Sequence, residues 1–398
     1  MDIARRICLK LFLLLALFFP AFYSVFDADY LIEYYGGFSW AYAFLVLSMI
    51  LLLLQKKFRK PNWYFWLILA GIAGYNLLFT YYNVRYLHWY GEQINNTIAF
   101  LFFLCLIGFD NTIMDKDQDI IPFLIKAAVI SNLCSILYFI FGYTSLVICN
   151  NHIIFGKLPE DFYEFRHYWV YSHKSDYALM LIGFLALCIR YKDRFSKKTW
   201  YFFSLGVFLT SLVLTHSWTG VLGAFVVFVG SLLDRINWRQ VVIKKIHIAG
   251  GLFAILLVAA GGRILLAERN LLTLGNRLPI WKGALRTIGE YPHGWGYYFG
   301  EVLIDCGGGL AVNNAHNIFL NAMLRFSAPV GICFTLLFVL ILAYAIYKCR
   351  SWMGAGLCAA SFMLLNMDYA LMNYEVAMFL LIIFLVCLYE GQGNQAKK

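Results

Sequence analysis

Basic side chains are concentrated in one stretch of the chain, between residues 263 and 331. Its six members are Arg263, Arg269, Arg277, Lys282, Arg286 and Arg325. The stretch lies between an apolar segment that ends near residue 260 and another that begins near residue 328. Arginine holds phosphate through parallel N–H groups, and its charge is permanent. This pattern predicts a site for an anionic ligand at a membrane surface.

The residues 275–292, GNRLPIWKGALRTIGEYP, are typical of a short helix. We expect Asn276 to cap it and Pro279 to lie in its first turn. The expected apolar face consists of Trp281, Leu285 and Ile288. Lys282 and Arg286 are four residues apart and share another face, while Arg277 adds its charge to the unpaired N–H groups of the first turn, a natural phosphate site. The alternative is an amphipathic helix that only lies on the bilayer.

A histidine precedes the next apolar run, in the sequence AHNIFLNAMLRFSAPVG of residues 315–331. His316 is placed to accept a proton from an attacking hydroxyl or to hydrogen-bond a phosphate leaving group. Three neighbouring amides are suited to binding hydroxyl groups: Asn313, Asn314 and Asn317. The alternative is a histidine that caps the start of a helix.

A second polar stretch, residues 160–177, interleaves charged groups with tyrosines and a tryptophan. Arg166 and His173 are its candidate ligand-binding residues, and His216 in a later short loop is a third. Aromatic faces next to charges suit a ligand with both apolar and anionic parts. An ordinary interfacial aromatic loop explains the same composition equally well. Three acids expected to be buried or half-buried on the outer side of the membrane are candidate bases or arginine partners: Asp176, Asp368 and Glu375.

The elements that must position these residues are membrane helices. Of the 398 residues 62% are hydrophobic and 14% are charged, and mean hydropathy is +0.70, which places the chain among polytopic membrane proteins. Apolar runs long enough to cross the bilayer recur about twelve times. We expect a single membrane domain over residues 1–398, and we interpret the first run as a span and not a cleaved signal peptide. The expected spans are 8–26, 38–55, 62–80, 95–109, 120–146, 175–190, 199–215, 219–233, 246–262, 328–347, 352–367 and 376–390.

The distribution of charge sets the orientation of these spans. The net charge is +10, and its strongest clusters lie near residues 5–10, 56–60, 190–198, 235–245 and 348–350. Lys and Arg in short loops stay in the cytoplasm, so both termini are predicted to be cytoplasmic and no nucleic-acid partner is needed to explain the charge. Two long outer segments, 147–175 and 263–327, then form one face, and most histidines fall on that face. The basic residues of the second segment are therefore retained against the topological preference.

Cysteine usage gives little indication of metal chemistry. Ten cysteines are spread along the chain without CxxC or Cys/His spacing, so we expect no metal and no cofactor. Only Cys149 and Cys306 fall in the two long outer segments. They could pair in an oxidising compartment or remain as two thiols, and both readings stay open.

The combined pattern of the basic stretch resembles the O-antigen ligase and bacterial polysaccharide polymerase superfamily, the Wzy and WaaL group. The residues that carry the resemblance, over about 70 positions, are Asn276, Arg277, Trp281, Pro292, Gly294, Trp295, Gly296, His316, Asn317 and Gly331. One position departs from the family's pattern. Where members often have a Ser-Arg pair in the loop after the seventh span, this chain has Trp218 at the expected arginine position. Either His216 or Arg166 supplies the missing group, or the donor is bound differently.

The resemblance implies an all-α GT-C-type membrane fold and an inverting, metal-independent glycosyltransferase. Its donor and acceptor would be undecaprenyl-diphosphate-linked glycans at the outer face of the bacterial cytoplasmic membrane. Arg277 would bind the diphosphate and His316 would act at the acceptor hydroxyl or steer the diphosphate. Lys282, Arg286, Asn317, Arg166, His173 and His216 would contribute to substrate binding.

Within that group the departure at Trp218 favours a polymerase of O-antigen, capsule or exopolysaccharide repeat units. A chain-length regulator and a flippase are then possible partners in the same bilayer. One alternative is a ligase that transfers the glycan to lipid A core. Another, from a different class, is a flippase or transporter for lipid-linked oligosaccharides, although related halves and matching broken helices are not evident in the sequence.

Overall fold

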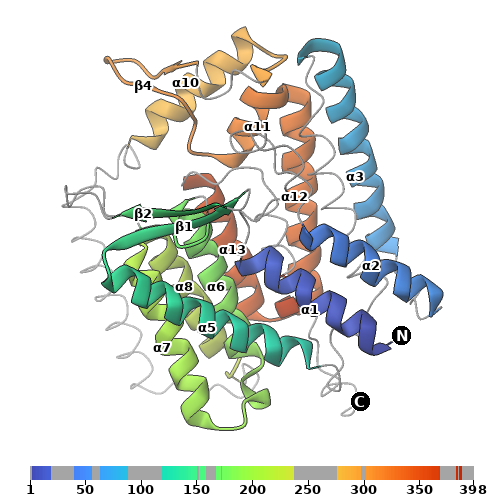
Figure 1. Cartoon of the computed structure of the whole chain (residues 1–398). Helices are drawn as coiled ribbons and strands as arrows, with labels where there is room; N and C mark the ends of the chain where they lie inside the picture. Colours follow the sequence, from blue (N-terminus) through green and yellow to red (C-terminus); the bar gives the residue numbers. More distant parts are fainter. Residues whose placement is uncertain are drawn as a thin grey trace.

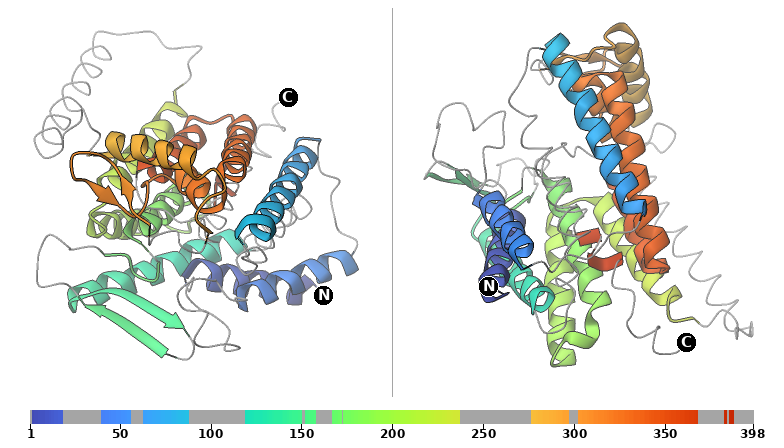
Figure 2. Two further views of the ribbon diagram at one scale, coloured as in Figure 1. Left: turned by 90° about the horizontal axis from the view of Figure 1, so that it is seen from above. Right: turned by 90° about the vertical axis from the view of Figure 1, so that its right-hand side faces the viewer.

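Most apolar segments of the sequence form helices in the computed structural model (Figures 1 and 2). The structure describes residues 2–18, 40–55, 63–87, 119–149, 152–157, 167–171, 173–236, 276–296, 302–367, 382–383 and 385–387. The longer helices are α1 (Asp2–Phe18), α2 (Trp40–Leu54), α3 (Trp63–Tyr82), α5 (Ile120–Ile140), α6 (Lys174–Arg190), α7 (Lys198–Leu214), α8 (Trp218–Leu233), α10 (Arg277–Glu290), α12 (Ala328–Cys349) and α13 (Trp352–Met367). The shorter elements are η1 (Asn83–Leu87), β1 (Tyr143–Cys149), β2 (His152–Lys157), β3 (Ile304–Asp305), β4 (Ala311–Val312) and α11 (Ile318–Phe326).

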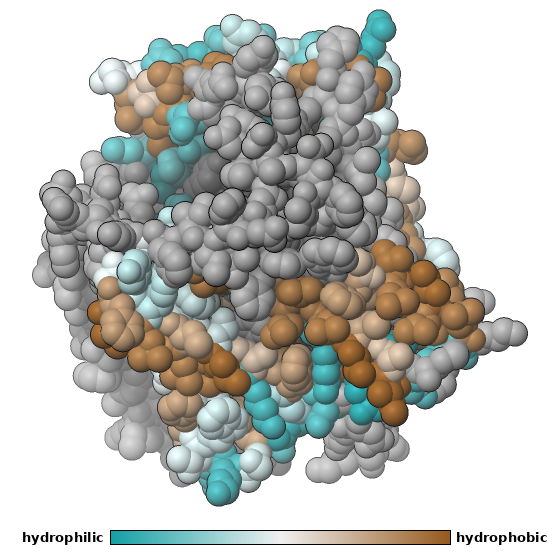
Figure 3. All heavy atoms as spheres, in the orientation of Figure 1, coloured by the Kyte–Doolittle hydropathy of each residue, from teal (hydrophilic) through white to brown (hydrophobic). Residues whose placement is uncertain are grey.

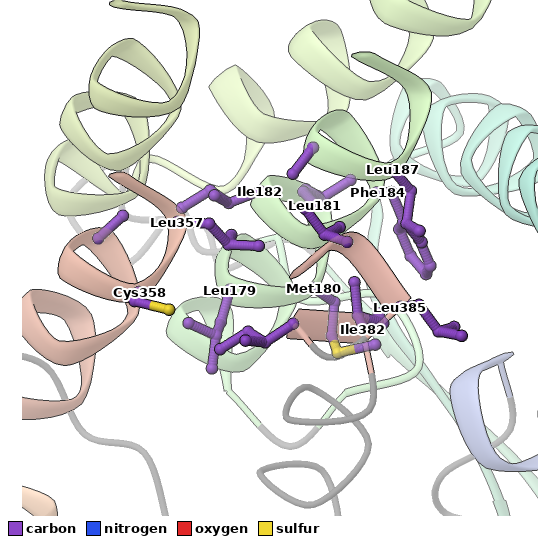
Figure 4. Close-up of a cluster of buried hydrophobic side chains, with 14 of the residues drawn as sticks. Leu179, Met180, Leu181, Ile182, Phe184, Leu187, Leu357, Cys358, Ile382 and Leu385 are labelled. Atoms are coloured by element: carbon purple, nitrogen blue, oxygen red, sulfur yellow. The ribbon is translucent and has the colours of Figure 1, made fainter. Parts of the chain in front are cut away.

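Helix α6 is the centre of the main hydrophobic core. Every residue from Ser175 to Ile189 is buried, because the helix is apolar on all sides and neighbours cover each face. Figure 4 shows side chains of α6 such as Leu181 and Phe184 among residues of α13 and of the segment near Leu385. The described part of that last segment is tied to α6 by the Tyr191 hydroxyl, which donates to the Leu385 carbonyl at 3.0 Å.

Small residues allow α8 and α13 to pack closely along their length. A Cβ atom added at Gly223 would lie 3.1 Å from the Ala360 Cβ, and one added at Gly230 would lie 2.6 Å from the Trp352 carbonyl oxygen. Close backbone approach through small residues is the usual way in which helices associate in a membrane. At the end of this seam, the Asp234 carboxylate accepts the backbone N–H groups of Trp352 and Met353. Asp234, the residue directly after α8, therefore caps the start of α13.

Two long helices, α3 and α12, lie side by side and extend beyond the α6–α7–α8 bundle (Figures 1 and 2). Helices α1, α2 and α5 instead lie across their direction. Large hydrophobic side chains on these crossing helices are exposed, among them Leu53, Ile130 and Leu137, and Figure 3 shows them as a broad hydrophobic surface. Exposed hydrophobic side chains gathered on one face in this way fit contact with lipid.

A separate tier, formed by α10, α11 and the β3–β4 hairpin, lies at the end of α12 where that helix begins (Figure 1). It has a small hydrophobic core of its own, made of Ile280, Ala284, Ile288, Ile304, Ala315 and Leu324. Only Ser327 separates α11 from α12, and a Cβ at Gly331 would lie 2.6 Å from the Met323 backbone nitrogen. Glycine at position 331 therefore allows α11 to fold back against the first turn of α12.

Most expected spans that fall within the described residues form helices with similar bounds. In the part of the chain that the structure describes, three helices are long and apolar enough to cross a membrane: Trp66–Leu87, Ile120–Ile140 and Ala328–Cys349. Helices α7, α8 and α13 are shorter apolar helices. The expected spans 95–109 and 246–262 lie outside the described residues, as does most of 376–390. The prediction of a continuous span over 120–146 was wrong at its end. Helix α5 stops at Ile140, a turn with Gly142 at φ 86° follows, and the chain enters the antiparallel β1–β2 hairpin.

Candidate functional site

The predicted helix of the basic stretch is α10, and it begins at Arg277. Asn276 is the residue before it, as expected, but its backbone is left-handed (φ 68°) and its side chain makes no capping hydrogen bond. The buried face consists of Ile280, Gly283, Ala284, Thr287 and Ile288. Leu285 was predicted on that face and is instead 57% exposed. The cause is the close approach of β3, because a Cβ at Gly283 would lie 2.5 Å from the Asp305 carbonyl oxygen.

Lys282 and Arg286 are both exposed, on the side of α10 that does not face its core. Arg277 is half-buried at the first position of the helix, where backbone N–H groups have no partner within the helix. Three cations on one helix of 14 residues give this part of the surface a positive potential. Below α10 the surface is hollowed, with hydrophilic residues at the opening (Figure 3). An anion bound at the start of α10 would face the N–H groups of the first turn and Arg277, whereas Lys282 and Arg286 lie on the other side of the helix.

His316 lies directly before α11, but it does not cap that helix. Asn317 is the cap: its side-chain oxygen accepts the N–H groups of Phe319 at 3.0 Å and Leu320 at 3.1 Å. The Asn317 amide nitrogen donates to the Asn366 side-chain oxygen at 2.8 Å, which joins the start of α11 to the end of α13. The expected role of Asn317 in ligand binding stays a prediction, and its oxygen already accepts two hydrogen bonds.

The same local geometry occurs at the start of α8. Ser217 caps α8 by accepting the Gly220 N–H at 3.2 Å, and His216 precedes it. Both histidines have left-handed backbones, with φ 51° at His216 and φ 47° at His316. This region is uncommon for residues other than glycine, although histidine and asparagine enter it more readily than most. Non-glycine residues held there are frequent at functional sites.

His173 caps the third of these helices, because its Nδ1 accepts the Ser175 N–H at 3.3 Å. The first turn of α6 also carries Asp176, which is 2% exposed. A carboxylate at this end of a helix is stabilised by the helix dipole. Asp368 and Glu375, the other acids that the sequence suggested, lie outside the described residues, and so does Arg166.

The helix ends that carry these histidines are linked to one another. A Cβ at Gly220 in the first turn of α8 would lie 2.8 Å from the Ala178 Cβ in α6. The α8–α13 seam continues the chain of contacts, and the bond between Asn366 and Asn317 completes it at α11. The structure therefore places the turns at 173, 216 and 316 on the same side of the bundle.

The core of the upper tier connects His316 to α10. Ala315, which directly precedes His316, is completely buried in the same cluster as Ile280, one turn after Arg277. The backbone here is fixed on both sides, since the Ala315 N–H donates to Asn321 at 2.8 Å and the His316 N–H donates to Asn314 at 2.9 Å. The segments that carry the two predicted catalytic residues are thus packed together, although they are 39 positions apart in the sequence.

A buried polar network, which is not evident from the sequence, joins α5, the segment with His167 and α6. His167 is fully buried, and its Nε2 lies 2.6 Å from the Ser135 hydroxyl. The Tyr177 hydroxyl donates to the Asn132 side-chain oxygen at 2.6 Å and lies 2.9 Å from Ser135. Burial lowers the pKa of His167 from 6.5 to about 4, so the imidazole is neutral at pH 7. Only the presence of a histidine in the loop was visible in the sequence.

Three further positions or groups considered from the sequence are Cys306, a possible metal site and Trp218. Cys306 is a free thiol that donates to the Ile304 carbonyl at 3.4 Å. Among the described residues, no group of three or more His, Cys, Asp or Glu is arranged to hold a metal ion. Trp218, at the position where the resemblance led us to expect arginine, is the first residue of α8 and is 52% exposed.

No protein-family model matches the chain, and no curated protein matches its sequence.

Proposed function

We propose that the chain is an inverting membrane glycosyltransferase that polymerises lipid-diphosphate-linked oligosaccharide repeat units. Its donor and acceptor would be undecaprenyl-diphosphate-linked glycans, and its products would be O-antigen, capsule or exopolysaccharide. The site would face outward from the bacterial cytoplasmic membrane, with both chain termini in the cytoplasm. The proposal begins from the motif resemblance and is supported by the way in which α10 and α11 are packed.

One observation supports the proposal most directly: Ala315 and Ile280 belong to one small core. This core joins the turn that carries His316 to the helix that begins at Arg277. Both lie at the start of α12, where Ile332 and Leu336 are exposed apolar residues suited to lipid. The lipid tail of such a donor needs an apolar face, and its diphosphate needs a cationic group. The bond to its glycan needs a base nearby that activates the acceptor hydroxyl. The start of α12, α10 and the turn at 316 are suited to these three roles.

The proposed reaction proceeds by a single displacement. The acceptor hydroxyl oxygen attacks the anomeric carbon of the donor sugar as the bond from that carbon to the diphosphate oxygen breaks. His316 accepts the hydroxyl proton, which gives the oxygen its nucleophilic electron pair. Arg277 and the N–H groups of the first turn of α10 bind the departing diphosphate, whose negative charge increases as the bond breaks. Lys282 and Arg286 add to the positive potential that attracts the donor.

The test uses variants that keep the local backbone. His316→Asn is chosen because asparagine tolerates a left-handed backbone, and Arg277→Gln keeps a side chain of similar length. In cells that make polymer only when this chain is supplied, we expect both variants to lose the polymer ladder on gels while membrane protein levels stay normal. Lys192→Gln, at an exposed basic residue in the turn between α6 and α7, should keep the ladder. Full-length polymer in both site variants would remove the catalytic assignment.

A further inference from the structure

An array of aromatic rings lies where α3 ends, close to the residues that follow α10. The last turn of this helix is the π-helical turn η1, which carries Tyr86. The Tyr86 ring stacks on the His293 ring with centroids 4.1 Å apart and planes inclined by 10°. Tyr82 and Tyr81 contact Tyr86 with centroid distances of 5.4 Å and 6.2 Å. We call the pair of parallel rings, Tyr86 and His293, the Tyr86–His293 stack.

The array is held in place by backbone contacts and not only by ring contacts. Gly294 has φ 80°, and a Cβ there would lie 2.9 Å from the Ser327 nitrogen at the corner between α11 and α12. Gly296 has φ 58°, and a Cβ there would lie 3.0 Å from a side-chain carbon of Leu87 in η1. The segment with His293 is therefore fixed between η1 and the α11–α12 corner. Single π-helical turns within helices are frequent at functional sites, and this one places Tyr86 against His293.

The rings remain accessible although they are ordered. Tyr81 is 55% exposed, Tyr86 is 40% exposed, and His293 is also exposed. Their exposure leaves ring faces and edges open to a ligand. An exposed set of ordered rings with polar edges is suited to a ligand that has one apolar face and hydroxyl groups at its rim. The C–H face of a sugar ring has this character, because its hydrogens carry partial positive charge and the aromatic face is negative.

We propose that the Tyr86–His293 stack binds a sugar ring of the glycan, at a distance from the reacting end. This inference rests on the proposed function and adds a subsite to it. Helix α10 has 14 residues, so its two ends lie about 20 Å apart at 1.5 Å per residue. Arg277 is at one end and His293 just beyond the other. A glycan whose diphosphate is held near Arg277 would reach the stack with a sugar several residues along the chain.

A sugar is favoured over a lipid headgroup by the charge around the stack. A zwitterionic or anionic headgroup would be held by basic side chains, and here Arg85 is the only one within η1. The other cationic residues of the tier are Arg277, Lys282 and Arg286 on α10 and Arg325 at the end of α11. The Arg325 guanidinium lies over the buried Phe326 ring, 5.4 Å from its centroid. A neutral sugar needs ring faces and hydrogen-bonding edges, and the tyrosine hydroxyls and the imidazole supply the edges.

The experiment measures binding of a soluble oligosaccharide to the purified full-length protein in detergent. The probe is the oligosaccharide released by mild acid from the polymer of the producing cells, and its affinity is measured by calorimetry. We expect Tyr86→Ala and His293→Ala each to weaken binding roughly tenfold, the size of a lost aromatic contact. Tyr86→Phe, which keeps the ring and loses only the hydroxyl, should weaken binding less. Tyr64→Ala is a matched control, because Tyr64 belongs to another aromatic cluster, with Trp63, Tyr344 and Tyr347, at the opposite end of α3.

Unchanged affinity in Tyr86→Ala and His293→Ala would overturn the subsite, and so would an equal loss in Tyr86→Phe, which keeps the ring. Reduced recovery of both alanine variants in the membrane fraction with normal sugar affinity would overturn it as well, in favour of a lipid anchor. The two proposals fail separately. If polymer persists in His316→Asn and Arg277→Gln, the polymerase assignment fails whatever the affinity of the stack. If the stack does not bind, the polymer assay on those two variants still stands.

Discussion

His167 is buried among polar groups, and its proton equilibrium affects the stability of the fold. The unfolded chain binds a proton on this residue below pH 6.5, while the folded chain does so only near pH 4. Between these values the unfolded state holds more protons, so the free energy of unfolding decreases as pH falls. The difference in pKa corresponds to about 3 kcal/mol in total, and no further loss from this residue is expected below pH 4.

The prediction is checked by thermal unfolding of the purified protein between pH 7.5 and 4. The wild type should lose stability steadily below pH 6.5. His167→Gln, which cannot titrate in this range, should start from a lower stability but depend less on pH. Parallel curves for the two proteins would show that His167 does not titrate as described.

The sequence shows which residues could bind a ligand or transfer a proton, but it does not show which of them do so. Asn317 was expected to bind ligand, yet its amide oxygen caps α11 and its nitrogen bonds to Asn366. Whether an amide faces a ligand or a helix end depends on backbone turns that residue type alone does not determine. His167 could not be recognised as buried, because its partner Ser135 is 32 residues away on α5. Periodicity within one segment carries no information about such a contact.

At the scale of elements, the seam between α8 and α13 depends on the absence of side chains. We expect Gly230→Ala to destabilise the protein by roughly 1–3 kcal/mol, since the added Cβ would lie 2.6 Å from a backbone oxygen that cannot move aside. The matched control is Gly206→Ala in α7, where no atom lies within 4 Å of the added Cβ. There alanine should be neutral or stabilising by up to about 1 kcal/mol, because it favours the helix.

The measurement is the unfolding temperature of both variants in the same detergent. A Gly230→Ala protein as stable as Gly206→Ala would mean that the two helices are not as close as described.

Helix positions could largely be predicted from hydropathy, and helix faces could not. The bounds of α13 match the expected span, and α10 begins where the Asn276 signal placed it. The face of α10 was misjudged at Leu285 because β3 approaches at Gly283 and Ala284, where small residues leave room. The apolar periodicity predicts that the large side chain of Leu285 is buried, whereas the packing against β3 requires the small residues Gly283 and Ala284. Similarly, Tyr143–Cys149 is apolar enough to continue a span, but Gly142 turns the chain into a hairpin.

At the scale of the whole molecule, the helices have two kinds of orientation. Helices α3 and α12 lie along one direction, and α1, α2 and α5 lie across it (Figure 2). Hydropathy predicted that all five cross the membrane, because it measures the length of an apolar run and not its angle. The total of about twelve spans stays a prediction, since several of them lie outside the described residues.

The orientation in the membrane leads to a labelling prediction. In a background with Cys149→Ser and Cys306→Ser, a membrane-impermeant maleimide should label Gly289→Cys in intact cells, since position 289 is exposed at the end of α10. Asp193→Cys, exposed in the turn between α6 and α7, should be labelled only after permeabilisation. Labelling of position 193 in intact cells would reverse the assigned topology and move the cationic tier to the cytoplasmic side.

The left-handed turns at 216 and 316 also limit what natural variation can do there. A branched or bulky side chain in this backbone region carries a steric penalty of about 1–2 kcal/mol, whereas glycine, asparagine, aspartate and histidine enter it more easily. Homologous chains that retain these two turns should therefore draw on that short repertoire at both positions. A valine or isoleucine at either one would indicate that the loop itself has been rebuilt. If histidine recurs at position 316 while position 216 varies among glycine, asparagine, aspartate and histidine, position 316 needs the imidazole itself. Position 216 then needs only a residue that allows the left-handed turn.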